Sequence, residues 1–320
     1  MIIKIMVFFD LVVLVISLIV LAKASEKIIE SAIKLAGYFK IGQLAVGFLL
    51  ISVSTSLPEL SVSIVSATQN AASITIGNVF GSNIADVLLV LGLTAVIYDI
   101  KTKQEEWGEA AFILLVVSVI TMTLIVLEGL DVYSGALLIC MFILFVYYLL
   151  KRKQPVAMTT NQITIKEALH AFLLFAVGIV VVIISSGFVV ESAIKLATGL
   201  NLAKSFIGAT IIAIGTSLPE LAVDLQAVRK RAYGLAIGDA IGSTMTNLTL
   251  VLGIAAMINP IVFTKEIVYI LGIFSVLANG LLLFLIFRSK PLTRNHGIVM
   301  LFLFLIYLLV LYGVQSTVRY

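Results

Sequence analysis

Two segments of the chain place a glutamate directly after a proline within an apolar run. Residues 52–59 read SVSTSLPE and residues 213–220 read AIGTSLPE. A proline inside a helix cannot donate to the carbonyl four residues earlier, and its ring pushes that carbonyl aside. We therefore predict that each helix is broken, with freed carbonyls beside one carboxylate. The hydroxyl groups of the two breaks belong to Thr55, Ser56, Thr216 and Ser217.

The alternative for each segment is a plain proline kink, which membrane helices tolerate. Two identical kinks, each followed directly by a glutamate, argue against that interpretation. A second pair of segments, residues 77–86 (GNVFGSNIAD) and 238–247 (GDAIGSTMTN), adds further oxygen ligands. Residues four apart share one face of a helix. The residues paired in this way are Ser82 with Asp86, and Ser243 with Asn247.

Glycines recur every four residues in this second pair, at positions 77, 81, 238 and 242. Such spacing lets helices approach closely, so we expect these segments to pack tightly against their neighbours.

The acidic residues of these segments have no basic partner within their own apolar runs. No lysine or arginine occurs between Lys40 and Lys101, or between Lys204 and Arg229. A buried carboxylate without a counter-charge is costly and normally takes up a proton or binds a cation. Glu59, Asp86 and Glu220 are therefore predicted to face bound cations or protons.

The expected ligands are all oxygen atoms, because neither histidine nor cysteine occurs in the four segments. Transition metals favour those two residue types. Oxygen ligands suit hard cations, and a large, flexible oxygen cage suits Ca²⁺ better than Mg²⁺.

The composition is that of an integral membrane protein. Of 320 residues, 61% are hydrophobic and only 12% are charged, whereas about 25% is typical of soluble domains. A helical span needs about 20 apolar residues, so we expect an all-α protein with ten transmembrane helices. The ten apolar runs lie at about residues 5–22, 42–68, 74–98, 110–127, 132–150, 167–190, 205–228, 235–258, 267–287 and 297–314.

The chain contains an internal repeat with a constant offset of 161 residues. ESAIKLA at 30–36 recurs at 191–197, and TSLPEL at 55–60 recurs at 216–221. Five spans per repeat is an odd number, so the second copy must enter the membrane from the opposite side. Inverted repeats with broken helices are typical of transporters that bind substrate near the midplane. We assign residues 1–150 to the first repeat, 151–165 to a cytoplasmic linker and 166–320 to the second repeat.

Lysines and arginines predict the orientation, since they are enriched in cytoplasmic loops. Sixteen of the 21 follow the odd-numbered spans, which predicts that both termini face outward. They lie singly or in triplets without interleaved aromatic residues, so we expect no nucleic-acid partner. The lone cysteine, Cys140, excludes a disulfide framework.

The two repeated motifs resemble the cation/calcium exchanger (CaCA) superfamily, and the GTSLPE form is most similar to its prokaryotic Na⁺/Ca²⁺ exchangers. The resemblance implies that Glu59 and Glu220 bind Ca²⁺, together with backbone oxygens of Thr55 and Thr216. It also implies Na⁺ sites. These carry over to Ser52, Ser56, Ser82, Ala213, Ser217 and Ser243.

Three features depart from the family pattern. Asp86 and Asn247 are exchanged relative to similar exchangers, which carry asparagine in the first repeat and aspartate in the second. Ser54 replaces a glycine of the motif. Asp224 and Asp239 are additional acids that are candidates to line the pathway or to carry protons.

The sequence therefore predicts a cell-membrane antiporter that exchanges Ca²⁺ for Na⁺ by alternating access, with H⁺/Ca²⁺ exchange as the alternative. A channel is disfavoured by the inverted repeat, and an enzyme by the lack of a nucleophile–base pair. We expect a monomer surrounded by lipid, with transported ions but no cofactor.

Overall fold

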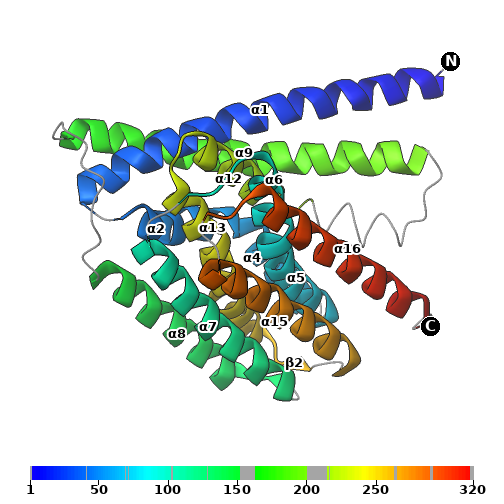
Figure 1. Cartoon of the computed structure of the whole chain (residues 1–320). Helices are drawn as coiled ribbons and strands as arrows, with labels where there is room; N and C mark the ends of the chain where they lie inside the picture. The colour runs from blue at the N-terminus through cyan, green and yellow to red at the C-terminus, as the bar shows by residue number, and fades with distance from the viewer. Residues whose placement is uncertain are drawn as a thin grey trace.

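The computed structural model is a helical bundle. It describes residues 2–40, 42–68, 70, 72–101, 104–127, 129–151, 163–199, 215, 217–262, 265–288 and 291–317. Two long helices, α1 (Ile2–Phe39) and α9 (Ile165–Gly199), lie side by side across one face of the other helices (Figure 1). Ile28 contacts α9 at Gly178, whereas Val13 shares an apolar cavity with Phe188. The two helices therefore run antiparallel.

The first half of the bundle follows α1 in short helical pieces. They are α2 (Gln43–Val46), the π-helical η1 (Gly47–Ser52), α3 (Val53–Thr55), α4 (Leu57–Thr68), α5 (Ala72–Ala85), the π-helical η2 (Asp86–Val90), α6 (Leu91–Ile97), α7 (Gln104–Val126) and α8 (Val132–Lys151). The second half follows α9. It contains α12 (Leu218–Arg229), α13 (Tyr233–Thr246), the π-helical η4 (Asn247–Val251), α14 (Leu252–Ile258), α15 (Lys265–Arg288) and α16 (Arg294–Thr317).

Element bounds in the two halves recur at the offset of the sequence repeat. A shift of 161 residues places α4 on α12, α5 on α13, η2 on η4 and α6 on α14 without a residue of difference. Contacts between the halves follow the same repeat. Helix α6 packs on α16, and their repeat equivalents, α14 and α8, also pack on each other. The same sequence pattern therefore produces the same local structure twice.

Candidate membrane spans dominate the described residues. Seven single helices are long and apolar enough to cross a membrane, and the bent pair Gln43–Thr55 and Leu57–Thr68 makes an eighth candidate. The predicted first span lies within α1, and part of the predicted seventh span, residues 205–214, lies outside the described residues. The protein is a multi-pass membrane protein and almost wholly α-helical. The described strands, β1 (Gly129–Leu130) and β2 (Ile261–Val262), form one short antiparallel pair.

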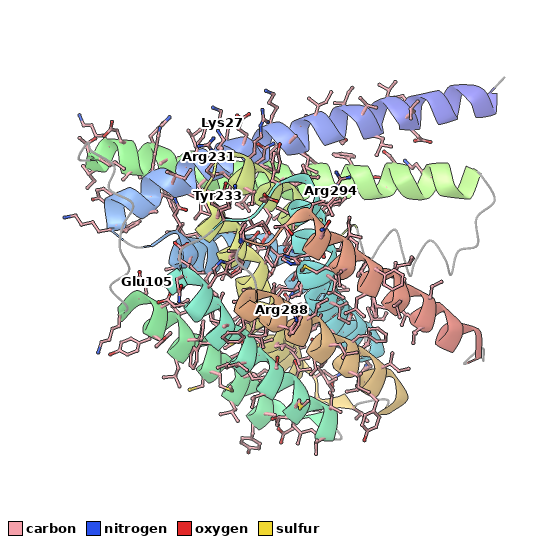
Figure 2. All side chains as sticks on the ribbon, viewed as in Figure 1. Lys27, Glu105, Arg231, Tyr233, Arg288 and Arg294 are labelled. Carbon is pink, nitrogen blue, oxygen red and sulfur yellow. The ribbon has the colours of Figure 1, made fainter. Side chains whose placement is uncertain are left out.

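An ion-pair cluster attaches α1 to the end of α12. Lys230 contacts Glu30 at 2.8 Å and Glu26 at 3.4 Å, while Lys27 also contacts Glu30 at 2.8 Å. The hydrogen bond from Lys230 lowers the pKa of Glu30 to about 2. Figure 2 labels Lys27 and Arg231 on this side of the bundle.

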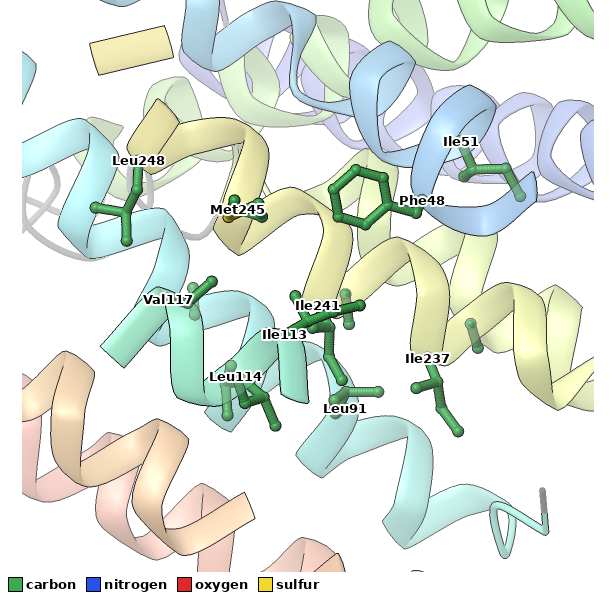
Figure 3. Packing of buried hydrophobic residues seen from close by; sticks show 14 of the residues in the cluster. Phe48, Ile51, Leu91, Ile113, Leu114, Val117, Ile237, Ile241, Met245 and Leu248 are labelled. Atoms are coloured by element: carbon green, nitrogen blue, oxygen red, sulfur yellow. The ribbon is translucent and has the colours of Figure 1, made fainter. Parts of the chain in front are cut away.

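Helix α13 forms the centre of the packing. All of its residues from position 234 to position 246 are buried. Figure 3 shows Ile241 and Met245 of α13 between Phe48 of η1 and the apolar side chains of α7. Helix α13 thereby holds the two halves of the bundle together.

The predicted close approach holds for the glycines of α13. A Cβ atom at position 242 would lie 2.9 Å from the Phe48 Cα atom and 2.7 Å from the Ser52 Oγ atom. At position 238 it would lie 3.1 Å from the Gly47 Cα atom. The 161-residue offset predicts that Gly77 and Gly81 face residues near 208. Those residues lie outside the described part of the chain, and the close approach of Gly77 and Gly81 therefore remains a prediction.

We predict that Gly242→Ala lowers the free energy of unfolding by about 1–3 kcal/mol, because the new methyl group meets backbone atoms that cannot move independently. Gly280→Ala is the matched control, since no atom of another described residue is found within 4 Å of a Cβ atom placed there. Thermal unfolding of both variants in detergent measures the difference. Equal stability of the two variants would contradict the close packing of α13 on η1.

Candidate ion-binding site

The predicted helix break lies at Ser56. Segments Gln43–Thr55 and Leu57–Thr68 meet there at a bend of 45°. Ser56 has φ −78° and ψ 6°, and its repeat equivalent Ser217 has nearly the same angles, φ −89° and ψ 9°. Each break places its glutamate in the first turn of the following helix, α4 or α12.

Three carboxylates from separate helices are buried in one region. Glu59 of α4, Asp86 of η2 and Glu220 of α12 are each only 1% exposed. The helices that carry them adjoin, because α4 packs on α5 and α12 packs on η2. The structure thus brings together the three acids that the sequence predicts to share a site.

Neutral oxygen atoms surround these acids. Ser82 donates to Glu59 Oε1 at 3.4 Å, which connects α5 with the first helix break. Asn78 supports the same turn, because its amide donates to the Glu59 carbonyl at 2.9 Å. Ser217 immediately precedes α12, which packs on η2 from the other half of the chain. Polar side chains from both halves therefore lie in this region.

Asp86 and Asn247 occupy matching places in the two halves. Each begins a π-helical segment, a feature that is frequent at functional sites. One turn earlier, Asn83 donates to the carbonyl of Thr244 at 3.2 Å. Asn83 and Thr244 are 161 residues apart, so a residue here contacts its own repeat equivalent. Asp86 and Asn247 accordingly lie on opposite sides of the junction between the halves.

Asp239 makes a contact that the sequence analysis did not predict. Its carboxylate accepts a hydrogen bond from Thr55 Oγ1 at 3.1 Å, across 184 residues of chain. Asp224 of α12 lies beside Asp239, and both residues are completely buried. The sequence marked Asp239 as unusual, because an acid replaces the expected asparagine. Its hydrogen-bond partner, Thr55, is seen only in the packing of α13 against the first half of the bundle.

Ten of the twelve predicted site residues fall within the described part of the chain, and each is at most 4% exposed. They are Ser52, Thr55, Ser56, Glu59, Ser82, Asp86, Ser217, Glu220, Ser243 and Asn247. Thr216 and Ala213 lie outside the described residues. Ser52 donates to the Phe48 carbonyl within its own helix. Side-chain oxygens of Ser56 and Asn247 form no hydrogen bond with other described residues.

Buried acids outnumber buried basic residues in the part of the chain that the structure describes. No lysine or arginine there is buried. Within the same residues, no three acidic, histidine or cysteine side chains are grouped closely enough to hold a metal ion by themselves. A bound cation would therefore depend on hydroxyl and carbonyl oxygens in addition to carboxylates, as Ca²⁺ commonly does.

The fold and the buried acids define a membrane transporter for cations. The chain matches the sodium/calcium exchanger protein family over residues 9–151 and 170–313, and it belongs to that family. The members of this family are secondary transporters of the cation/Ca²⁺ exchange class and not enzymes.

Individual relatives cover most of the chain. It is 26% identical to the sodium/calcium exchanger MaX1 of Methanosarcina acetivorans, over 95% of this chain and 98% of that protein. It is 30% identical to the putative antiporter CaxA of Alkalimonas amylolytica, over 77% of this chain and 79% of that protein. The solved structure of the sodium-calcium exchanger NCX_Mj, soaked with 10 mM Na⁺ and zero Ca²⁺, superposes with a TM-score of 0.78. The two chains are 26% identical, and the match covers 98% of this chain and 100% of that one.

Asp86 and Asn247 lie at equivalent positions of the two repeats, so an acid at either position should contribute a similar charge to the site. Asp86→Asn removes one of the three carboxylates and should raise the Na⁺ concentration needed for half-maximal Ca²⁺ flux about tenfold, because a charge-assisted contact is lost. The double variant Asp86→Asn with Asn247→Asp restores the summed charge and should recover part of this loss. Ca²⁺ flux in proteoliposomes at graded Na⁺ concentrations measures both effects. Unchanged Na⁺ dependence in Asp86→Asn would show that Asp86 is not a coupling residue.

Proposed function

We propose that this protein is a secondary antiporter that exchanges Ca²⁺ for Na⁺ across the cell membrane by alternating access. The observation that carries the proposal is the cluster of Glu59, Asp86 and Glu220, which is buried within a membrane protein and has no buried lysine or arginine among the described residues. Burying three carboxylates in one region of the protein is costly, and bound cations would offset that cost. Antiport follows because either Ca²⁺ or several Na⁺ ions can neutralise the cluster, whereas an empty site cannot easily close.

The proposed Ca²⁺ ligands are the carboxylates of Glu59 and Glu220 and the backbone oxygens of Thr55 and Thr216. The proposed Na⁺ ligands come from the flanking small residues and the exchanged pair. They are Ser52, Ser56, Ser82, Ala213, Ser217, Ser243, Asp86 and Asn247. The dense arrangement of neutral oxygens around three acids favours this assignment, since it can serve one divalent or several monovalent ions.

The proposed architecture is ten transmembrane helices in two inverted repeats, residues 1–150 and 166–320, joined by a cytoplasmic linker at 151–165. Support comes from the repeated element bounds, the antiparallel packing of α1 on α9 and the contact between Asn83 and Thr244. Equivalent helices that run antiparallel are expected when one repeat enters the membrane from the opposite side. We propose that the monomer is the transport unit, because both halves of the site come from one chain.

H⁺/Ca²⁺ exchange is the second candidate, and the pair Asp224–Asp239 favours it. Two fully buried carboxyl groups side by side are well suited to share a proton. Asp239 also contacts Thr55, so a proton on this pair could be coupled to the Ca²⁺ ligands. The relative CaxA is named a putative antiporter without its ions.

We predict that an inward Na⁺ gradient at clamped pH drives Ca²⁺ out of proteoliposomes, and that Glu59→Gln and Glu220→Gln abolish this flux. Each substitution preserves the side-chain volume but removes a charge that Ca²⁺ would balance. Glu105→Gln at the exposed start of α7 is the matched control and should transport normally.

Two results of that assay would contradict the proposal. Ca²⁺ flux that responds to a pH gradient but not to Na⁺ would establish the proton-coupled alternative. Wild-type flux in a well-folded Glu59→Gln protein would remove Glu59 from the site.

We further predict that Arg229 faces the cytoplasm, that Tyr133 faces outward, and that both termini lie on the outer side. Cysteines introduced at these two exposed positions, with Cys140→Ser as background, should react with an impermeant reagent from opposite sides of sealed cells or vesicles. Labelling from the same side would refute the ten-span topology.

A further inference from the structure

A cavity of about 600 Å³ opens where α6, α12, α13 and α16 meet, away from the buried acids. Its lining carries four basic side chains and one acidic side chain, all exposed. They are Lys101, Arg229, Arg231, Arg294 and Asp99. Figure 2 shows Arg231, Tyr233 and Arg294 toward the end of the bundle that is covered by α1 and α9. Such a cavity repels cations, so it does not serve the Ca²⁺ site.

Three consecutive basic residues, 229–231, lie at the end of α12, and they differ in their contacts. Lys230 forms salt bridges with Glu26 and Glu30 of α1. Arg229 and Arg231 instead line the cavity, and neither forms a salt bridge with another described residue. Two guanidinium groups thus remain available at the cavity wall.

The equivalent place in the other half of the molecule has different chemistry. A shift of 161 residues places Arg231 on Asn70 and Tyr98 on Asn259. There, Asn259 Nδ2 donates to Asn70 Oδ1 at 2.7 Å and to the carbonyl of Ala67 at 3.1 Å. This neutral amide bridge shows that the fold does not require basic residues at these positions. The described residues at the repeat-equivalent place therefore lack the positive charge of this cavity.

We propose that this cavity binds the phosphate group of an anionic ligand at the membrane surface. Guanidinium groups recognise phosphate through paired, charge-assisted hydrogen bonds. The rim adds Ile97, which is 51% exposed, and Tyr98, which is 39% exposed. An apolar and an aromatic side chain beside arginines suit the interface of a bilayer, where basic pockets between helices bind anionic headgroups. A soluble phosphate compound shares the same chemistry and is distinguished by the test.

The test measures binding to the purified, full-length protein in neutral detergent by titration calorimetry at constant ionic strength. The probes are dioctanoyl phosphatidylglycerol, dioctanoylglycerol, which has the same chains but no phosphate, and inorganic phosphate. We expect the phosphatidylglycerol to bind at least about tenfold more tightly than dioctanoylglycerol. Arg231→Gln should weaken its binding about fivefold, and Arg229→Gln with Arg231→Gln about 25-fold, at the affinity expected per basic residue near a membrane surface.

Arg288→Gln is the matched control, because Arg288 is exposed at the end of α15 and packs on Phe284 outside the cavity. It should leave phosphatidylglycerol binding unchanged, and unaltered melting temperatures will show that all variants are folded. Displacement of the lipid by millimolar phosphate identifies a soluble phosphate ligand, whereas resistance to displacement identifies the lipid headgroup. Equal binding of the two lipids, no effect of the double substitution, or an equal effect of Arg288→Gln would overturn the proposal.

Discussion

The structure depends on the burial of several carboxylates in one region of the bundle. Glu59, Asp86 and Glu220 come from different helices, yet they lie in one water-excluded region with exposures of 1% each. Their mutual repulsion opposes the packing of the same helices that place them there. In the proposed function, cations that neutralise the cluster stabilise the closed protein, so that transport and stability depend on the same interaction.

The rest of the bundle can be understood as support for that cluster. The break at Ser56 turns Glu59 into the interior, and α13 approaches η1 closely enough for Asp239 to reach Thr55 because residues 238 and 242 are glycines. The contact between Asn83 and Thr244 holds Asp86 and Asn247 near the junction of the two halves. Long apolar helices, including α7 and α15, enclose these polar elements and carry exposed apolar side chains on their outer faces.

Much of this arrangement could be predicted from the sequence because its signals are local. The 161-residue offset, the proline before Glu59 and the absence of lysine and arginine around the acids need no tertiary information. The partner of Asp239 could not be predicted, since Thr55 is 184 residues away and meets it only through helix packing. The π-helical turns at Asp86 and Asn247 carry no evident sequence signature. The sequence offset pairs Arg231 with Asn70, but the hydrogen bond of Asn70 with Asn259 and the cavity beside Arg231 are seen only in the structure.

Competition between the transported ions is the most direct test of the central claim. Equilibrium binding of radioactive Ca²⁺ to the detergent-solubilised protein should decrease as Na⁺ is added, with a Hill coefficient above one, because several Na⁺ ions replace one Ca²⁺ in the same acidic cluster. K⁺ at equal ionic strength should displace far less Ca²⁺. Full retention of Ca²⁺ at saturating Na⁺, or equal displacement by K⁺, would contradict a shared site neutralised in turn by the two ions.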